Sequence, residues 1–132
     1  MQFSELTSDG VTYRVTGHAP GAIGINDVGY HASLIVRPRS LYADWPVRAA
    51  DELDLEALAP ILEEPPEVLL IGTGEVSRFP PRELRRELRR RELGVEIMDT
   101  AAACRTYNLI MAEGRDVAAA LIVEAAEPST TE

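Results

Sequence analysis

Three strand-like runs in the second half of the chain restrict its fold more than any other feature. They are Val68–Ile71, Val95–Met98 and Val117–Val123, and helix-forming segments separate them. The first and last runs are apolar on successive residues, which indicates strands buried on both faces and is typical of parallel sheets. The order strand–helix–strand–helix–strand therefore predicts right-handed βαβ crossovers in this half of the chain.

The two connecting segments carry recognisable helix boundaries. Pro80-Pro81 opens the first helix, and we expect Gly94 to be its C-terminal glycine. Asp99-Thr100 provides an N-terminal cap for the second helix, which we expect to run to about Glu113 and to end before Gly114. These boundaries support two crossover helices between the three strands.

The first half of the chain has the features of antiparallel strands. Val11–Thr16 alternates apolar and polar residues, as a half-buried strand does. Ile23–Ile25 and Tyr30–Val36 flank the turn residues Asn26–Gly29, which predicts a hairpin. Further on, Asp54 is a suitable N-cap for a short helix that contains a helix-splitting proline. We therefore expect antiparallel strands beside the βαβ half, which gives a mixed sheet.

The length of 132 residues fits one domain and is too short for two full cores. No repeat, linker or shift in composition marks an internal boundary. We therefore predict a single α/β domain over residues 1–124, with helices packed against a mixed sheet. Residues 125–132 are polar and are predicted to form a disordered C-terminal tail.

Composition excludes several kinds of function. The net charge of −9 argues against nucleic acid as a partner. All 13 basic residues are arginine, so Schiff-base chemistry and a phosphate-loop lysine are excluded. One cysteine cannot form an internal disulfide framework or a multi-cysteine metal site. Acidic Glu5 and Asp9 replace the basic residues of a targeting peptide, and no run is long enough to span a membrane, so we expect a cytoplasmic protein.

A candidate ligand site lies where two of the predicted strands end. The turn Gly72-Thr73-Gly74 follows a buried strand, at a position where α/β folds bind ligands. The helix start at Thr100 offers free backbone N–H groups to an anion, and the same helix dipole lowers the pKa of a nearby thiol. The candidate ligand-binding residues are Gly72, Thr73, Gly74, Asp99, Thr100, Cys104 and Arg105. The alternative is a merely tight turn, with Ala101–Cys104 as small residues that pack the helix against the sheet and bury the thiol.

The predicted first helix carries an uneven distribution of charge. Residues 82–92 contain six arginines and three glutamates, a net +3, which leaves −12 for the rest of the chain. At 100° per residue, five arginines share one face, which we call the arginine face. It consists of Arg82, Arg85, Arg86, Arg89 and Arg90. The arginine face predicts docking to an acidic protein or to anionic lipid headgroups, and the alternative is a solvated helix face with ordinary charge pairs.

Histidine provides only a weak indication of metal binding. His18 and His31 lack the helical spacing of paired metal ligands, so we predict no metal site. Nothing in the sequence indicates a cofactor, and no catalytic constellation is recognisable. A homo-oligomer remains compatible with the sequence.

Several segments together resemble an uncharacterised bacterial and archaeal domain family. These segments are Gly24–Pro38, Ile71–Gly74, Gly94–Asn108, Glu113–Arg115 and Ala118–Ile122. The eukaryotic relatives of that family include mitochondrial complex I (NADH dehydrogenase) assembly factor 3 and the adipogenesis-associated Mth-domain protein. The resemblance implies a three-layer α/β arrangement around a mixed sheet. It also implies assistance in assembling a respiratory complex, peripheral to the inner membrane, and it supplies no catalytic residues.

Two hypotheses follow. The first is a non-enzymatic interaction or assembly protein that docks to a protein partner, such as an assembly intermediate of a respiratory or membrane complex. The second is a small-molecule enzyme or a binder of small anionic ligands. It would use the Gly72–Gly74 turn and the Thr100 helix start, with Cys104 or Arg105 facing the ligand.

Overall fold

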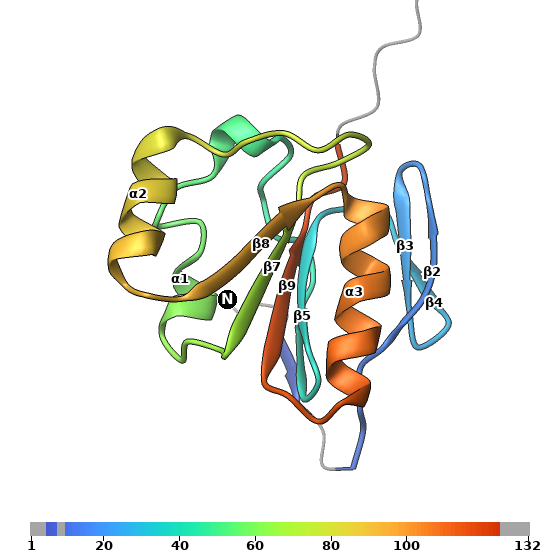
Figure 1. The fold of residues 1–132 in the computed structure, drawn as a ribbon. Helices are drawn as coiled ribbons and strands as arrows, with labels where there is room; N and C mark the ends of the chain where they lie inside the picture. Colours follow the sequence, from blue (N-terminus) through green and yellow to red (C-terminus); the bar gives the residue numbers. More distant parts are fainter. Residues whose placement is uncertain (1–4, 8–9, 125–132) are drawn as a thin grey trace, which may run out of the picture.

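A mixed sheet forms the centre of the molecule (Figure 1). The computed structural model describes residues 5–7 and 10–124, so the predicted tail lies outside the described residues. The sheet has six strands in the order β1-β6-β5-β9-β7-β8. Its strands are β1 (Glu5–Thr7), β5 (Leu34–Arg37), β6 (Ser40–Tyr42), β7 (Val68–Gly72), β8 (Gly94–Met98) and β9 (Val117–Leu121). Strand β7 runs parallel to β8 and β9, whereas β5 pairs antiparallel with β6 and β9, which confirms the mixed α/β fold.

A second, smaller sheet contains the predicted hairpin. It is the antiparallel meander of β2 (Val15–Ala19), β3 (Ala22–Ile25) and β4 (Val28–Tyr30). Asn26 and Asp27 form the β3–β4 turn with φ angles of 50° and 70°, the left-handed conformation that tight hairpins require. The hairpin therefore lies beside the main sheet rather than within it.

Helices cover the main sheet on both faces, in three layers (Figure 1). On one face, α3 (Thr100–Ala112) and the small sheet enclose a core that includes Tyr107, Leu34 and Leu70. The opposite face is covered by the 3₁₀ helix η1 (Ala50–Glu52), α1 (Ala59–Leu62) and α2 (Arg82–Arg90). Every residue of β7 and β9 is buried, as their apolar runs predict.

Four predicted boundaries are wrong in detail. The strand predicted at Val11–Thr16 begins only at Val15, because the Asn26 side chain bonds to the Arg14 N–H and the Thr12 carbonyl in place of a neighbouring strand. Gly94 begins β8, and Glu92 instead takes the left-handed conformation after α2, with a φ of 58°.

The third boundary concerns the run Tyr30–Val36, which divides between the two sheets. Strand β4 ends at Tyr30, and β5 begins at Leu34 in the main sheet. The helix predicted after Asp54 is also shorter than expected. The Asp54 carboxylate caps a turn by accepting from the Ala57 N–H at 2.8 Å, and regular α-helix begins only at Ala59.

Candidate functional site

The predicted turn and the predicted helix start are in direct contact. The Thr100 hydroxyl accepts a hydrogen bond from the Gly74 N–H and donates one to the Ile122 carbonyl, both at 2.8 Å. The Thr100 N–H in turn donates to the Gly74 carbonyl at 2.9 Å. One buried hydroxyl thus joins the turn after β7, the start of α3 and the chain after β9. We call this arrangement the Thr100 junction.

The segments that meet at the Thr100 junction are packed closely, and their polar groups bond to one another. A Cβ atom on Gly72 would lie only 2.9 Å from the Thr100 Cα, so glycine is needed for α3 to approach β7 this closely. The side chain of Thr73 is fully buried. Its hydroxyl donates to the Val76 carbonyl at 2.8 Å and accepts from the Arg78 N–H at 3.0 Å. The polar groups of the turn therefore already have partners within the chain.

An internal carboxylate occupies the outer side of the turn. Glu124 Oε1 accepts a hydrogen bond from the Glu75 N–H at 3.0 Å, and a Cβ atom on Gly74 would overlap the Glu124 side chain. The Arg78 guanidinium lies 3.9 Å from the other oxygen of the same carboxylate. A negative group of the protein itself thus lies beside the backbone where the sequence predicts an anionic ligand.

The remaining residues of the predicted ligand site belong to α3 or to its N-cap. The Asp99 carboxylate accepts from the Ala102 N–H at 2.8 Å and caps the helix as predicted. Cys104 lies in the core between α3 and the sheet, whereas Arg105 is exposed to solvent. Burial raises the pKa of the Cys104 thiol to about 12, although Arg105 opposes the shift. The structure therefore does not bring the thiol and the guanidinium together on the turn.

We expect the Cys104 thiol to be unreactive in the native protein. A pKa near 12, against an ordinary value of 9.0, leaves about a thousandfold less thiolate than in the unfolded chain. Labelling with a disulfide reagent at mildly alkaline pH, with and without denaturant, measures this difference. Rapid labelling of the native protein would contradict the burial of this thiol.

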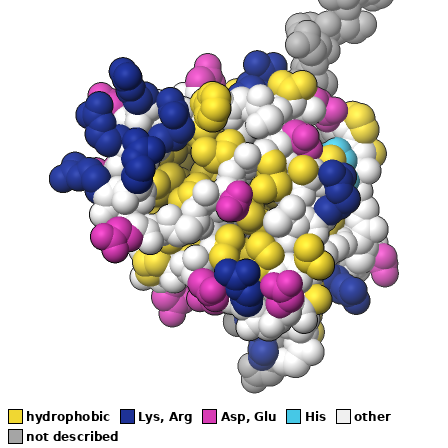
Figure 2. Space-filling view, viewed as in Figure 1, with side chains coloured by type: hydrophobic (Ala, Val, Ile, Leu, Met, Phe, Trp, Pro, Cys, Tyr) yellow, Lys and Arg dark blue, Asp and Glu magenta, His cyan; other side chains and the backbone are white. Residues whose placement is uncertain are grey.

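In the arginine face of α2, Arg85 is half-buried and the other four arginines are exposed. An exposed aromatic side chain lies next to Arg85. Leu84 and Leu88 are buried under the helix. The Arg85 guanidinium donates to the Pro80 carbonyl at 3.0 Å and lies 5.0 Å from the centre of the Phe79 ring. Phe79 is 78% exposed. Figure 2 shows basic side chains gathered over α2 beside a group of hydrophobic ones.

Phe79 is not among the functional residues predicted from the sequence. The signal available was a lone aromatic residue between Arg78 and the proline pair that precedes α2. Val76, in the same loop, is 48% exposed. An exposed aromatic stacked under an arginine extends the charged surface with an apolar edge, a composition common at protein interfaces.

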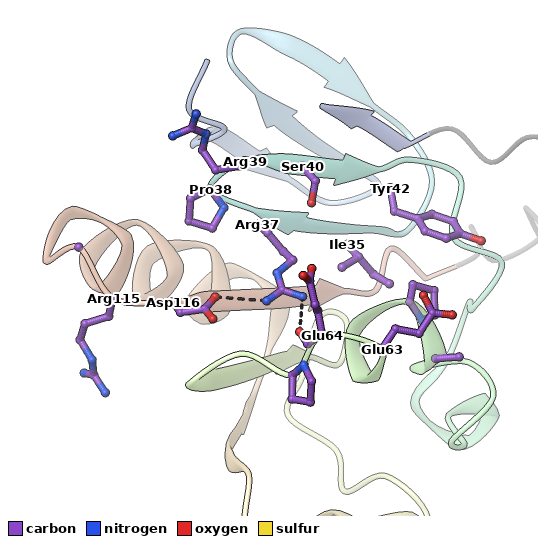
Figure 3. Close-up of a pocket in the computed structure, with 14 residues that line it drawn as sticks. Ile35, Arg37, Pro38, Arg39, Ser40, Tyr42, Glu63, Glu64, Arg115 and Asp116 are labelled. Carbon is purple, nitrogen blue, oxygen red and sulfur yellow. Dashed lines mark hydrogen bonds and ion pairs between the residues drawn. The ribbon is translucent and has the colours of Figure 1, made fainter. Parts of the chain in front are cut away.

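A groove of about 1230 Å³ lies elsewhere, between strands β5 and β6 and helix α1 (Figure 3). The Arg37 guanidinium points into it and donates to the Glu64 carbonyl at 2.8 Å and to Asp116 Oδ1 at 3.2 Å. In Figure 3, the side chains of Arg39 and Arg115 point away from the Arg37 guanidinium. None of the candidate residues from the sequence lines the groove. These hydrogen bonds of Arg37 connect β5 to the chain after α1 and to the chain before β9.

His18 lies on β2 and His31 follows β4, and both are exposed. Within residues 5–7 and 10–124, no group of three or more potential metal ligands is present. In the same part of the chain, no helix is long and apolar enough to cross a membrane.

The six-stranded mixed sheet, with helices on both faces and the antiparallel meander beside α3, defines an α/β domain. The chain belongs to the family described as "Protein of unknown function (DUF498/DUF598)", whose model matches residues 15–122. Among solved structures, it is similar to a Mth938-like domain from Bordetella pertussis, with 32% identity, a TM-score of 0.71 and coverage of 96% of this chain and 99% of the other. A Bordetella parapertussis protein is similar at 36% identity, with a TM-score of 0.79, over 89% of this chain and 100% of that chain.

Among named proteins, the chain is similar to the Danio rerio NADH dehydrogenase [ubiquinone] 1 alpha subcomplex assembly factor 3. The two are 33% identical over 110 residues, which is 82% of this chain and 63% of the zebrafish protein. The chain thus spans less than two thirds of that relative. These similarities confirm the resemblance to a family related to complex I assembly factor 3.

Proposed function

We propose that this protein is a non-enzymatic assembly factor that docks to an acidic protein partner through the arginine face of α2. The zebrafish relative is named as an assembly factor, and the likeness covers 82% of this chain. The observation that carries the proposal is the arginine face itself, five arginines on a segment (residues 82–92) of net charge +3 in a chain of net charge −9. We further propose that it acts in the cytoplasm, on an assembly intermediate at the inner membrane.

The docking surface is available without rearrangement of the fold. Arg86 and Arg89 are exposed, and neither side chain is engaged in an ion pair within the described residues. Arg90 and Arg91 instead pair with Glu87, at 3.3 and 3.4 Å. Attraction to an acidic surface raises the association rate and selects the partner, and it weakens as salt increases.

The alternative, an enzyme or a binder of small anions at the Gly72–Gly74 turn, has less support. The polar groups of that turn bond to Thr100, Glu124 and each other. The turn lines neither the groove between β5, β6 and α1 nor the hollow between the segment 53–56 and α2.

We expect charge reversal on α2 to remove the partner. Tagged protein is purified from its own cells as wild type and as the double variant Arg86→Glu/Arg89→Glu, and copurifying proteins are quantified by mass spectrometry. The matched control is Arg14→Glu/Arg39→Glu, which makes the same charge change at two exposed positions, one before β2 and one in the β5–β6 turn. Acidic proteins captured by the wild type and the control should be depleted at least about tenfold with the α2 variant, a loss of roughly 1.4 kcal/mol. Equal capture by all three proteins would refute docking through α2.

A further inference from the structure

The outer edge of β8 is open. Strand β8 is the last strand of the main sheet and, among the described residues, pairs only with β7. The Met98 carbonyl accepts a hydrogen bond from the Thr73 N–H at 2.9 Å, so the backbone groups of Met98 face β7. Because these groups alternate in direction along a strand, those of Val95 and Ile97 face away from β7. A row of unpaired N–H and C=O groups is a template for an added strand.

One side of this edge is bordered by arginines. A hollow of about 540 Å³ separates the segment 53–56 from the flank of α2 that carries Glu83 and Glu87. At 100° per residue, the opposite flank carries Arg85 and Arg89. In Figure 1, β8 crosses in front of the sheet beside α2, and Figure 2 shows basic side chains at this position next to hydrophobic ones. A strand added to β8 would have positive charge on this side.

On the other side of the edge, α3 presents an apolar flank beside the exposed Glu96 of β8. The Thr106 hydroxyl lies 3.5 Å from the Met98 sulfur, which places this flank of α3 next to β8. Leu109 lies near Thr106 on the same flank and is 64% exposed, and the half-buried Ile110 is next to it. The edge of β8 thus lies between a basic flank of α2 and an apolar flank of α3.

We propose that an extended segment of the partner protein, with alternating acidic and apolar residues, adds to β8 as a further strand of the sheet. Successive side chains of a strand point to opposite faces. A single segment therefore directs carboxylates towards Arg85 and Arg89, and apolar side chains towards Leu109. Its backbone bonds to the free groups of Val95 and Ile97. This inference rests on the proposed function, since it uses the arginines of α2, and it specifies the chemistry of the docked partner.

A second copy of this chain is a poorer match for the same edge. Val95 and Ile97 pack with the core on the α2 side of the sheet, so Glu96 lies on the α3 side. An antiparallel pair of β8 strands would therefore place apolar side chains beside the arginines and a carboxylate beside the apolar flank. It would also bring two arginine faces to the same side of the joined sheet. Charge complementarity thus favours an acidic segment from another protein.

The first test uses a synthetic peptide of alternating glutamate and valine, with a lysine–valine peptide as the control. Titration into ¹⁵N-labelled protein should shift the amide resonances of Val95, Ile97 and Arg89, and should slow hydrogen exchange at the Ile97 N–H. The lysine–valine peptide should bind at least about tenfold more weakly. The absence of shifts at β8, or equal binding of both peptides, would overturn the inference. A wild-type dimer formed through β8 would overturn it as well.

Substitutions then separate the backbone contribution from the charge contribution. Ile97→Pro removes the outward N–H and no hydrogen bond to β7, so proline is tolerated at this edge. Ile97→Ala has a similar loss of side chain and keeps the N–H. The proline variant should bind the glutamate–valine peptide at least about tenfold more weakly than the alanine variant. Equal binding by the two variants would refute strand addition, and the exchange measurement on the wild type decides the question if the proline variant does not fold.

Copurification from cells with the two kinds of variant distinguishes failure of strand addition from failure of the proposed function. If Ile97→Pro keeps the cellular partner while Arg86→Glu/Arg89→Glu loses it, docking through α2 holds and strand addition fails. If both variants keep the partner, the proposed function itself fails.

Discussion

Replacing Gly72 with alanine is expected to destabilise the protein by about 3 kcal/mol. The added Cβ would lie 2.9 Å from the Thr100 Cα and 3.1 Å from the Ala103 Cβ. These atoms belong to the first turn of α3 and to its buried face, so a flexible side chain cannot relieve the overlap. The helix would have to move away from β7 and would disturb the hydrogen bonds of the Thr100 junction. Denaturant unfolding followed by circular dichroism measures the change in the free energy of unfolding.

Gly17→Ala is the matched control for this substitution. Gly17 also lies in a strand, but no atom lies within 4 Å of the position that its Cβ would occupy. Both substitutions reduce the conformational entropy of the unfolded chain to a similar extent, so the difference between them isolates the overlap with α3. A free energy of unfolding for Gly72→Ala within about 0.5 kcal/mol of that for Gly17→Ala would contradict the close approach of α3 to β7.

The parts of the fold that were predictable are those that local sequence determines. Val68–Ile71 is apolar on successive residues because β7 is buried on both faces, and the burial of every residue of β7, between β9 and β8, confirms the interpretation. Asp99 caps α3 through a bond to the N–H of Ala102, three residues on. Such patterns depend on a few neighbouring residues, so a single sequence reveals them.

The parts that were missed depend on residues far apart in the sequence. Strand β6 is only three residues long, and its pairing with β5 is what makes it a strand. The strand predicted from Val11 fails because Asn26, twelve residues beyond Arg14, bonds to that segment. Neither feature has a local pattern, because each is created by a contact that forms only in the folded chain.

The candidate ligand site was likewise predictable only in part, because some of its contacts come from residues far away in the sequence. The sequence analysis placed the Gly72–Gly74 turn near Thr100 because both follow neighbouring parallel strands, and the structure joins them by hydrogen bonds. It did not foresee that the Glu124 carboxylate would approach the same turn, 49 residues beyond Glu75. The turn that the sequence predicts as a ligand loop packs closely against α3 and the Glu124 side chain. This observation favours a role for the protein through its surface.

Replacing Thr100 with valine is expected to lower the free energy of unfolding by about 2–4 kcal/mol, since two buried polar groups lose their partner. Valine has nearly the same shape as threonine, so the packing around α3 is retained while the hydroxyl is lost. The Gly74 N–H and the Ile122 carbonyl, each bonded to that hydroxyl at 2.8 Å, are then left unsatisfied. Denaturant unfolding measures the loss, and Thr100→Ser, which retains the hydroxyl, should recover most of it.

Thr106→Val provides the control for this substitution on the same helix. Its hydroxyl is half-buried and contacts only the Met98 sulfur, a weak acceptor, at 3.5 Å. We therefore expect a change within about 0.5 kcal/mol for Thr106→Val. If Thr100→Val were as mild as Thr106→Val, the hydroxyl of Thr100 would not be joining the turn, the helix and the chain after β9. The Gly74 N–H would then be available to bond to a ligand, and the alternative of an anion-binding turn would gain support.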